Sequence, residues 1–579
     1  MAEPTIQLGG GNWAGKSNNL LGYYKEGERF YKQDFTFSRS TTGTYTDSEG
    51  YIQEMPYNLL QYSEDFSQWS LNTSGISSIE ANYAASPEGL QNAYKVNFIV
   101  QSDSDLSLSR IHTITGGSTY VYSIYIKGEG TNIGKDVVIK SKRQGGGDSA
   151  GTTTTQTLTN EWKRINFTTT YAANNINGRL LISSNDATSC LIYGAQAEEG
   201  TSAKTYFPTT TRLNMPRVDY LNNSNGSLIL EPQRANLFTD SEGTGNFSTF
   251  GRANCTYSSG SGFNSFQSSC SVDVSVFSNS KPNSVLIYNA VSGDTNLFSF
   301  FIKKKSGFYA KITNGNATNS FTIDLDLSDG SVINTTGTAI GNTNIIQLSD
   351  NCFRVEFLTS ANSTTSAGLI NVRFYDNSSF ADWSNTDDDL SFFISGLQLE
   401  SNESYATSYI PTSGSSVTRN ADVCTDGGDA SRFNDNEGVL YAEIAALEET
   451  SSSSKYISIS DETYNNRLSI LFSSGATNQI RAFLRVGGTP QVDFNGSVTD
   501  VTDYNKVAFK YKANDFALWI NGVEVATDTS GSVFSADTLT KLSFSEINTT
   551  SGKFEGKVKD LKVYNTALTD SELQALTTL

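Results

Sequence analysis

Histidine is almost absent from this chain, and its scarcity excludes whole classes of catalytic and metal site. Among 579 residues the one histidine is His112. A single histidine cannot build a His-rich zinc site, and it allows at most one histidine-dependent catalytic centre. An isolated histidine more often has a structural role than a catalytic one. We therefore expect His112 to be structural.

Cysteine is also sparse, and none of the five cysteines forms a CxxC pair. Their number is odd, so they cannot all pair within one chain. Cys255 and Cys270 are close enough in sequence for a local disulfide, which leaves two interpretations open. We favour the simpler one, in which the cysteines are buried free thiols. The full set is Cys190, Cys255, Cys270, Cys352 and Cys424.

Basic residues are outnumbered, and long apolar runs are missing. Lys and Arg total 41 against 60 Asp and Glu, which gives a net charge of −19. Nucleic-acid binding needs clustered positive charge, so we expect no nucleic-acid partner. No apolar run approaches the roughly 18–20 residues of a membrane span, and residues 1–16 lack the basic and apolar regions of a secretory signal. We expect a protein made in a cytoplasm, without membrane insertion.

The familiar catalytic motifs are absent as well. The chain contains no Walker loop, no GxSxG elbow and no HExxH motif. Glycoside hydrolysis needs only two carboxylates at a fixed separation, and 60 acidic residues leave that activity open. On balance the sequence predicts a protein that is not an enzyme.

The densest acidic cluster is Asp387, Asp388 and Asp389, in the phrase WSNTDDDL. Crowded carboxylates are stabilised either by a cation or by solvent. Ca²⁺ binds carboxylate and carbonyl oxygens, so these aspartates are candidate calcium ligands. A solvated acidic loop is the alternative, and we favour it. The sequence thus predicts no cofactor other than, in the first case, a structural Ca²⁺.

The residues that are abundant favour β-structure. Ser, Thr, Asn, Gly, Tyr and Phe are frequent, and aromatic residues make up 11% of the chain. β-Branched and aromatic residues favour strands, whereas Gly, Asn and Ser favour turns. We predict an all-β protein, whose length suggests roughly three or four domains.

Four phrases occur twice in the same order, which indicates a duplicated domain. The first pair is NLLQYSEDFSQWS (58–70) and ANLFTDSEGTGNFSTF (235–250). The other pairs lie at 123–130 and 299–307, at 161–170 and 351–360, and at 191–210 and 392–413. The order is kept while the loops lengthen, as expected of two copies of one domain.

Within each copy the residues alternate as they do in half-buried strands. RINFTT places Ile165 and Phe167 in one core, and RVEFLTS places Val355 and Phe357 in the other. Glycines within LIYGAQAEEG and FISGLQLESN indicate a β-bulge or a close backbone approach. Several short strands separated by turns predict a β-sandwich of jelly-roll type.

The opening phrase of each copy begins its sandwich. We expect Asn58 and Asn236 to fix the entering strand, with Leu59 and Leu237 in the cores. The domains are then an N-terminal arm and lead-in segment (1–57), a first sandwich (58–215), a linker (216–234), a second sandwich (235–421) and a third domain (422–579). The apolar run at 228–230 in the linker is able to add a short strand to a neighbour.

The third domain resembles the laminin-G-like, or concanavalin A-like, lectin sandwich. Residues 504–529 form alternating strands with a turn at Asn521-Gly522. The phrase GKVKDLKVYNTALTDSELQAL (556–576) adds a strand and a short helix, with Thr569 and Glu572 as a capping box. The resemblance covers residues 430–577 and implies the fold. We expect Trp519 to be a core or rim aromatic rather than a sugar-stacking platform.

The two repeats are similar to the carbohydrate-binding-module-like domains of bacteriophage tail and fibre proteins. The phrases that carry the similarity include NLLQYSEDFSQW, YGAQAEEGTSAKTYFPTT and SGLQLESNESYATSYIPTS. The lead-in FTFSRSTTGTYTDSEGYIQEMPYNLL (35–60) is similar to the segment that often precedes such domains. This resemblance implies a virion protein, other phage virion proteins (capsid or tail) as partners, and a homotrimer.

The N-terminal segment belongs to neither copy, and we expect it to be an irregular arm. A glycine run gives it flexibility beside Trp13, Leu20, Leu21, Tyr23 and Tyr24. Exposed aromatic and aliphatic anchors on a mobile arm suit docking to another protein. The alternative is an arm packed on its own domain. We favour docking to the virion through these five residues.

The sequence as a whole predicts a non-enzymatic phage fibre or decoration protein at the virion surface. Its N-terminus would dock to the particle, and its lectin-like domains would bind a host-surface glycan. Two alternatives stay open: a tailspike that depolymerises polysaccharide, and an exported bacterial adhesin. The glycan, the face that binds it, and the head or tail location are not set by the sequence.

Overall fold

The computed structural model describes residues 2–579 with gaps in the loops. Outside the description are residues 17–18, 27–28, 56–57, 90, 101–104, 115, 144–150, 204–205, 210–214, 242–249, 254–255, 261–268, 274–283, 289–294, 306–307, 315–320, 338–339, 349–350, 360–368, 376–377, 379–390, 450–451 and 549–551. The described residues form antiparallel sheets and one short α-helix, α1 (Asp570–Thr577), so the prediction of an all-β fold is confirmed. No helix in this described part has the length and apolar character of a membrane span.

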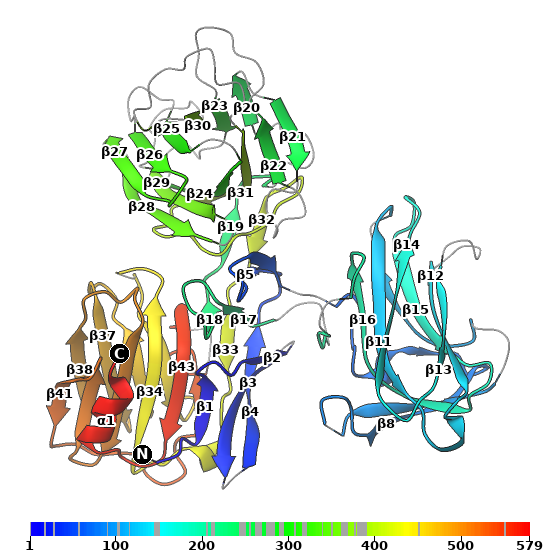
Figure 1. Cartoon of the computed structure of the whole chain (residues 1–579). Helices are drawn as coiled ribbons and strands as arrows, with labels where there is room; N and C mark the ends of the chain where they lie inside the picture. Colours follow the sequence, from blue (N-terminus) through cyan, green and yellow to red (C-terminus); the bar gives the residue numbers. More distant parts are fainter. Residues whose placement is uncertain are drawn as a thin grey trace. The chain divides into compact units, whose positions relative to one another are not determined.

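The chain divides into two compact units (Figure 1). The smaller consists of Lys16–Asn18 and Pro56–Met215, and it contains the first sandwich. The larger consists of Met1–Gly15, Asn19–Met55 and Pro216–Leu579. It contains the second sandwich, the linker, the third domain and most of the N-terminal segment.

The first sandwich has two five-stranded sheets around one apolar core. One sheet has the order β13 (Thr153–Thr157), β12 (Asp136–Arg143), β15 (Asn177–Ser183), β10 (Leu108–Thr113), β7 (Ser70–Leu71). The other has the order β14 (Lys163–Thr170), β11 (Thr119–Lys127), β16 (Ser189–Glu199), β9 (Ala93–Phe98), β8 (Ile76–Ala84). Ile165 and Phe167 lie in this core, as their alternation predicts.

The second sandwich repeats this arrangement with six strands in each sheet. One sheet has the order β20 (Phe250–Ala253), β23 (Ser284–Tyr288), β30 (Leu369–Tyr375), β25 (Tyr309–Asn314), β26 (Phe321–Asp326), β27 (Val332–Gly337). The other has the order β21 (Thr256–Gly260), β22 (Ser269–Asp273), β31 (Ser391–Ser401), β24 (Asn296–Lys304), β29 (Cys352–Thr359), β28 (Ile340–Gln347). Val355 and Phe357 are completely buried in its core.

A buried asparagine holds the entering chain in each sandwich. The side chain of Asn58 donates to the Ala195 and Phe207 carbonyls, at 2.6 and 3.3 Å, and accepts from the Leu60 and Ala197 amides, both at 3.0 Å. Asn236 makes the same four bonds, to the Leu397 and Ile410 carbonyls and from the Phe238 and Leu399 amides, at 2.8–3.1 Å. This confirms that the asparagines fix the entering strand.

Two successive residues after each asparagine contact the core, and the second of them is buried more deeply. Leu59 and Leu237 are half-buried against the cores, whereas Leu60 and Phe238 are fully buried. The asparagine oxygen accepts from the amide two residues ahead, and that turn directs the later side chain inward. Leu59 and Leu237 therefore contact the cores, as expected, and the residue that follows each of them lies deeper.

The predicted glycine bulges are confirmed in both sandwiches. The pairing of β11 with β16 shifts register between Ser123 and Tyr125, and that of β24 with β31 shifts between Ser299 and Phe301. Opposite these shifts lie Gly194, with φ of +57°, and Gly396, with φ of +63°. A residue with a side chain rarely adopts this left-handed conformation, so glycine suits the extra residue of the bulge.

The third domain packs a large sheet on a five-stranded one. The large sheet has the order β33 (Val423–Thr425), β4 (Arg29–Ser38), β3 (Asn19–Glu26), β1 (Ile6–Gly9), β43 (Gly556–Tyr564), β34 (Glu437–Ala446), β39 (Asn505–Lys512), β40 (Phe516–Ile520), β41 (Val523–Asp528), with β2 (Ala14–Lys16), β17 (Arg217–Asp219) and β18 (Ser227–Leu230) beside this path. The smaller has the order β38 (Thr489–Ser497), β37 (Gln479–Val486), β36 (Arg467–Phe472), β35 (Lys455–Ser460), β42 (Lys541–Ser543).

Helix α1 covers the outer face of the large sheet. The Thr569 hydroxyl accepts from the Glu572 amide and the Glu572 carboxylate accepts from the Thr569 amide, so the capping box is confirmed. Leu573 and Trp519 lie in one small apolar cluster there. Trp519 is 7% exposed, which agrees with a packing role.

The N-terminal segment is not irregular, which differs from our expectation. It supplies β1 to β4, and β1 pairs with β43 from Ile6↔Val563 to Gly9↔Asp560 (Figure 1). The glycine run makes a tight turn rather than a flexible hinge. Gly9, Gly10 and Gly11 have φ of +84°, +63° and +86°, and a Cβ at Gly9 would lie 2.5 Å from the Lys559 carbonyl oxygen.

Both sandwiches are insertions between strands of the large sheet. The chain passes through β4 before the first sandwich and returns in β17 and β18. β18 pairs with β43 at Leu228↔Val558, so the apolar run of the linker does add a strand to a neighbour. After the second sandwich the chain returns in β33, which pairs with β4.

Candidate functional site

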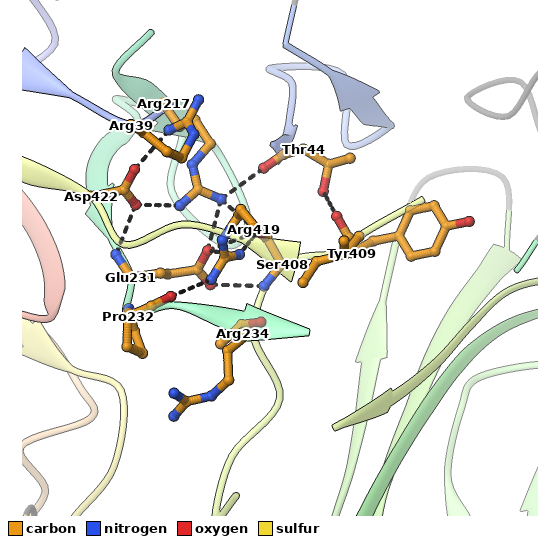
Figure 2. Close-up of polar contacts among 12 residues, drawn as sticks. Arg39, Thr44, Arg217, Glu231, Pro232, Arg234, Ser408, Tyr409, Arg419 and Asp422 are labelled. Carbon is orange, nitrogen blue, oxygen red and sulfur yellow. Dashed lines mark hydrogen bonds and ion pairs between the residues drawn. The ribbon is translucent and has the colours of Figure 1, made fainter. Parts of the chain in front are cut away.

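Five charged residues meet at the base of the second sandwich, brought together by three separate passes of the chain. Arg39 follows β4, Arg217 begins β17 and Glu231 follows β18. Arg419 ends β32 (Val417–Arg419), which pairs with β19 (Arg234–Asn236), and Asp422 precedes β33. Each pass borders one of the two insertions. We call these five residues the ionic junction (Figure 2).

The ionic junction is continuous and fully buried. Asp422 accepts from Arg39, at 2.7 Å, and from Arg217, at 2.5 Å. Glu231 Oε2 lies 2.7 Å from Arg217 Nη1 and 2.5 Å from Arg419 Nη1 (Figure 2). None of the five side chains is more than 2% exposed. Three guanidinium groups thus share two carboxylates, and every carboxylate oxygen has a partner.

The charges of the junction stabilise one another in their ionised forms. Burial alone would raise the pKa of Glu231 and of Asp422. The nearby guanidinium groups reverse this and hold both pKa values below their usual range. Burial lowers the pKa of Arg39 to about 10, although Asp422 opposes the change. A buried network of this kind has a structural role, since both of its carboxylates are fully engaged within the protein.

The junction also holds neighbouring segments. The Ser408 amide and hydroxyl both donate to Glu231, at 2.7 Å. The Thr44 hydroxyl donates to the Tyr409 carbonyl at 2.6 Å, so the hairpin of β5 (Thr44–Thr46) and β6 (Ile52–Glu54) is fixed to the same segment. Ile52 packs in an apolar cluster with residues of the second sandwich. The lead-in segment is therefore part of this structure rather than a tether.

A cleft of about 660 Å³ lies beside the junction within the larger unit. Its walls come from the lead-in hairpin, the edge of the second sandwich at β28 and β29, and the third domain. The lining combines charged, amide, hydroxyl and aromatic groups. These include Tyr45, Asn344, Arg354, Glu356, Tyr405, Thr407, Glu448 and Lys557.

Glu356 is a carboxylate of the cleft wall that two neighbouring side chains hold in place. Arg354 Nε lies 3.2 Å from its Oε1, and the Asn344 amide donates to its Oε2 at 3.1 Å. Burial raises the pKa of Glu356, with the charge of Arg354 acting in the opposite direction. Arg354 is itself fixed by bonds to the Ser299 hydroxyl and the Thr407 carbonyl. The cleft wall is therefore rigid and polar here.

Aromatic side chains line the same cleft. The guanidinium carbon of Arg234 lies 5.2 Å from the centre of the Tyr405 ring. The Tyr409 hydroxyl bonds to the Ser241 hydroxyl at 2.6 Å, which fixes the ring against Phe301. Aromatic surfaces beside amide and hydroxyl groups suit a ligand that has both apolar faces and many hydroxyls.

Among the described side chains, the predicted docking residues Trp13, Leu20 and Tyr23 do not form an exposed patch. Leu20 is completely buried in the core of the third domain, where it contacts the partner strand β4. Trp13 packs against that core and donates to the Asn225 carbonyl at 2.9 Å. Tyr23 is half-buried and accepts from Asn12 at 3.5 Å. The side chains of Leu21 and Tyr24 lie outside the described residues. Treating Leu20 as an exposed anchor was wrong, because its side chain is buried in the core of the third domain.

The other predicted sites have mixed outcomes. Asp387, Asp388 and Asp389 lie outside the described residues, so the calcium hypothesis is not tested. Within the described part, no three His, Cys, Asp or Glu side chains are grouped as metal ligands.

The cysteines and the histidine can be followed further. Cys190, Cys352 and Cys424 are buried free thiols, as predicted. Cys255 is not described and neither is the side chain of Cys270, so their pairing stays a prediction. His112 is 5% exposed, and its Nε2 lies 2.8 Å from the Tyr122 hydroxyl, which fits a structural role.

The ionic junction was not predicted from the sequence, although the sequence contains a signal for it. Arg217, Glu231, Arg419 and Asp422 all stand in the phrases that flank the second sandwich, PRVDY, LEPQR and VTRNADV. Charged residues are infrequent in this chain, so their concentration at these boundaries marks the place.

Comparison with known proteins finds a family match within the third domain. Residues 430–574 match the family described as the concanavalin A-like lectin/glucanases superfamily. This segment is about a quarter of the chain, and it agrees with the resemblance seen in the sequence. A comparison with curated proteins finds no match.

Solved structures give only distant likenesses. One is the tandem CBM22 domain of Xyn10C from Paenibacillus barcinonensis (12% identity, 60% of this chain and 98% of that chain, TM-score 0.23). Others are the CBM40 of an IT-sialidase from Ruminococcus gnavus (18%, 26% and 93%, 0.23) and domains LG4-5 of the mouse laminin alpha1 chain (12%, 50% and 90%, 0.19). At these scores the likenesses carry no argument about function.

Proposed function

We propose that this protein is a non-enzymatic glycan-binding protein that serves as a fibre or decoration protein at the surface of a phage particle. The observation that carries the glycan-binding part is the match of residues 430–574 to the concanavalin A-like lectin/glucanases superfamily. The virion part rests on the resemblance of the duplicated sandwiches and the lead-in segment to phage fibre proteins. The ligand is a host-surface polysaccharide.

The cleft beside the ionic junction is the site we propose for a neutral part of that glycan. Asn344 is exposed there, and its amide reaches Glu356, so both groups are placed to bond sugar hydroxyls. Tyr45 and Tyr405 supply aromatic surface for the apolar faces of sugar rings. Each such contact is weak, and several copies on one particle would raise the avidity. A homotrimer would supply those copies.

We propose that the protein docks to the particle through a surface other than the five predicted docking residues of the N-terminal segment. β1 to β4 are integrated into the third domain, and Leu20 is buried there. A fibre of this design would attach through an exposed surface of a folded domain. Electron cryo-microscopy of purified particles tests this directly. Density for the sandwiches outside the shell supports the fibre role, whereas particles that lack the protein contradict it and leave the exported adhesin.

Glycan binding is tested with the full chain and two matched asparagine variants. Asn344→Ala removes the exposed amide of the cleft, and Asn334→Ala removes an amide of β27 that donates to Asp324 at 3.4 Å. We expect Asn344→Ala to weaken binding to a neutral host polysaccharide by about fivefold or more, roughly 1 kcal/mol, and Asn334→Ala to leave it unchanged. Equal affinities for both variants would remove the cleft as the site.

Polysaccharide cleavage is the second candidate, and Glu356 is the observation that favours it. A carboxyl group with a raised pKa in a cleft is a candidate general acid. Glu231, which also lines this cleft, is enclosed by Arg217 and Arg419 and cannot reach a substrate. Release of reducing ends from host polysaccharide, lost in Glu356→Gln, would replace the binding proposal with an enzyme.

A further inference from the structure

The outer face of the five-stranded sheet of the third domain carries a group of arginines. Along β37, Ile480, Ala482 and Leu484 face the core. Arg481, Phe483 and Arg485 alternate with them and face outward. On the neighbouring strand β36, Arg467 also faces outward and stands directly across from Arg485 in the pairing. We call Arg467, Arg481, Phe483 and Arg485 the arginine cluster.

All three guanidinium groups surround one aromatic ring. The guanidinium carbons of Arg467, Arg481 and Arg485 lie 5.2, 5.3 and 5.5 Å from the centre of the Phe483 ring. Contacts at this distance are attractive, because the face of the ring is electron-rich. Arg467 also lies 5.5 Å from the ring of Tyr464, which is 44% exposed. The cluster is thus held in place and has an aromatic side chain at its rim.

Two of the three arginines have carboxylate partners. Arg481 makes two parallel contacts with Asp493, both at 2.5 Å, and Arg467 Nη2 lies 2.8 Å from Glu546. Among the described residues no carboxylate pairs with Arg485, and its buried Nε makes no hydrogen bond. Three positive groups therefore share two negative ones, on the surface of a chain with a net charge of −19.

The placement of Arg467 opposite Arg485 is unfavourable unless a further negative group is near. Like charges at directly paired positions of a sheet destabilise it. Burial lowers the pKa of Arg467, and the charge of Arg485 lowers it further while Glu546 opposes this. An anionic group beside Arg485 would relieve the repulsion and supply its missing partner. The planar guanidinium suits carboxylate and sulfate groups, which accept two parallel hydrogen bonds.

We propose that the arginine cluster binds an anionic group of an acidic polysaccharide, a carboxylate or a sulfate, with Arg485 as its main charged contact. This inference rests on the proposed glycan-binding function and names a ligand class for the third domain. Phe483 and the carboxylates of Asp493 and Glu546 position the guanidinium groups. Tyr464 offers its exposed ring to the adjoining sugar.

The test compares three polymers on the full chain: hyaluronan, which carries carboxylates, chondroitin sulfate, which carries both groups, and neutral dextran. Binding is measured by calorimetry at low and at high salt. We expect both or one of the acidic polymers to bind, and affinity to fall as salt rises. Binding of both indicates that a carboxylate suffices, and binding of chondroitin sulfate alone indicates a sulfate. Failure of both acidic polymers to bind would overturn the inference.

Two variants assign the site. Arg485→Gln removes the unpaired charge, and Lys512→Gln removes one exposed charge elsewhere in the same domain. We expect Arg485→Gln to weaken acidic-polymer binding about tenfold or more, and Lys512→Gln to weaken it less than twofold. Equal losses would show a general charge effect and overturn the site. An unchanged melting temperature for Arg485→Gln confirms that the variant is folded.

The same variants separate this inference from the proposed function. Binding of a neutral host polysaccharide that depends on Asn344, without binding of either acidic polymer, would overturn the arginine cluster and leave the cleft in place. Binding of an acidic polymer that depends on Arg485, with no effect of Asn344→Ala on any glycan, would support the arginine cluster and remove the cleft.

Discussion

Asn58 in the first sandwich and Asn236 in the second make the same four hydrogen bonds, yet the cores beside them differ in chemistry. In the first core the Tyr122 hydroxyl bonds to His112 and to the Tyr171 hydroxyl, at 2.8 and 2.6 Å. The second core is an apolar cluster that includes seven phenylalanines, among them Phe298, Phe300, Phe321 and Phe357.

One stacked pair of aromatic rings occurs at the equivalent position in both cores. Tyr122 stacks on Phe167, and Phe298 stacks on Phe357, each with ring centres 5.5 Å apart. The bonds that set the backbone are thus retained in both copies, while the polar content of the interior has diverged. Both copies keep the four asparagine hydrogen bonds, because losing one would leave a buried polar group of the backbone without a partner.

Replacing Asp422, at the end of the second sandwich, should have the largest effect on stability. Asp422→Ala would leave Arg39 and Arg217 buried without a counter-charge, and breaking a buried ion pair costs about 3–5 kcal/mol. We expect the second sandwich and the third domain to lose protection in hydrogen exchange, with residues 58–215 unchanged. Asp329→Ala, at an exposed turn of the second sandwich, is the control. Loss of protection in both sandwiches would contradict the localisation.

Replacing the equivalent asparagine in each sandwich tests how much its four hydrogen bonds stabilise that sandwich. Asn58→Ala and Asn236→Ala each remove four buried hydrogen bonds, so each should cost its own sandwich roughly 2–4 kcal/mol. Hydrogen exchange resolved by residue would show which sandwich opens. The two costs should agree, since the bonds agree. A large loss of stability in one sandwich with none in the other would mean that the two asparagines do not have equivalent roles.

The single histidine should make the two cores respond differently to pH. Burial lowers the pKa of His112 from 6.5 to about 4. The folded pKa lies below the unfolded one, so the stability that this neutral group contributes is complete above pH 6.5 and is lost as the pH falls towards 4. We expect the first sandwich to lose roughly 2–3 kcal/mol between pH 6.5 and pH 4 through this residue. His112→Gln should abolish that loss, as measured by denaturant unfolding followed by hydrogen exchange.

The smallest expected effect concerns the two bulges. Gly194→Ala and Gly396→Ala would force alanine into the left-handed region, at a cost of about 1–2 kcal/mol each. At Gly194 the added Cβ would also lie 2.9 Å from the Tyr206 ring. A drop of a few degrees in the melting temperature of each variant would agree with this. An unchanged melting temperature would show that the bulge tolerates a side chain.

Local patterns predicted much of the fold from the sequence. The alternation at Ile165 and Phe167, the bulge glycines, and the capping box of Thr569 and Glu572 all act over a few residues, and all were confirmed. The apolar run at 228–230 signalled a strand, although the sequence did not name its partner.

Long-range pairing explains what the sequence did not reveal. β1 pairs with β3 and also with β43, more than 500 residues away, and that distant pairing leaves no sign in the neighbouring sequence. The glycine run of the N-terminal segment suggested flexibility because a tight turn and a mobile loop have the same composition. The ionic junction likewise joins Arg39 to Asp422 across both insertions. Neither the cleft nor the arginine cluster follows from any phrase taken alone.

The position of β43 sets an order of events for the growing chain. This strand, Gly556–Tyr564, is synthesised after both sandwiches, yet it is the direct partner of β1, β18 and β34. Until it leaves the ribosome, the N-terminal strands and the linker strand have an unpaired edge, while each sandwich already holds all of its own strands. The third domain can therefore complete its large sheet only after translation has passed residue 564. A chain halted earlier would expose that edge to chaperones and proteases.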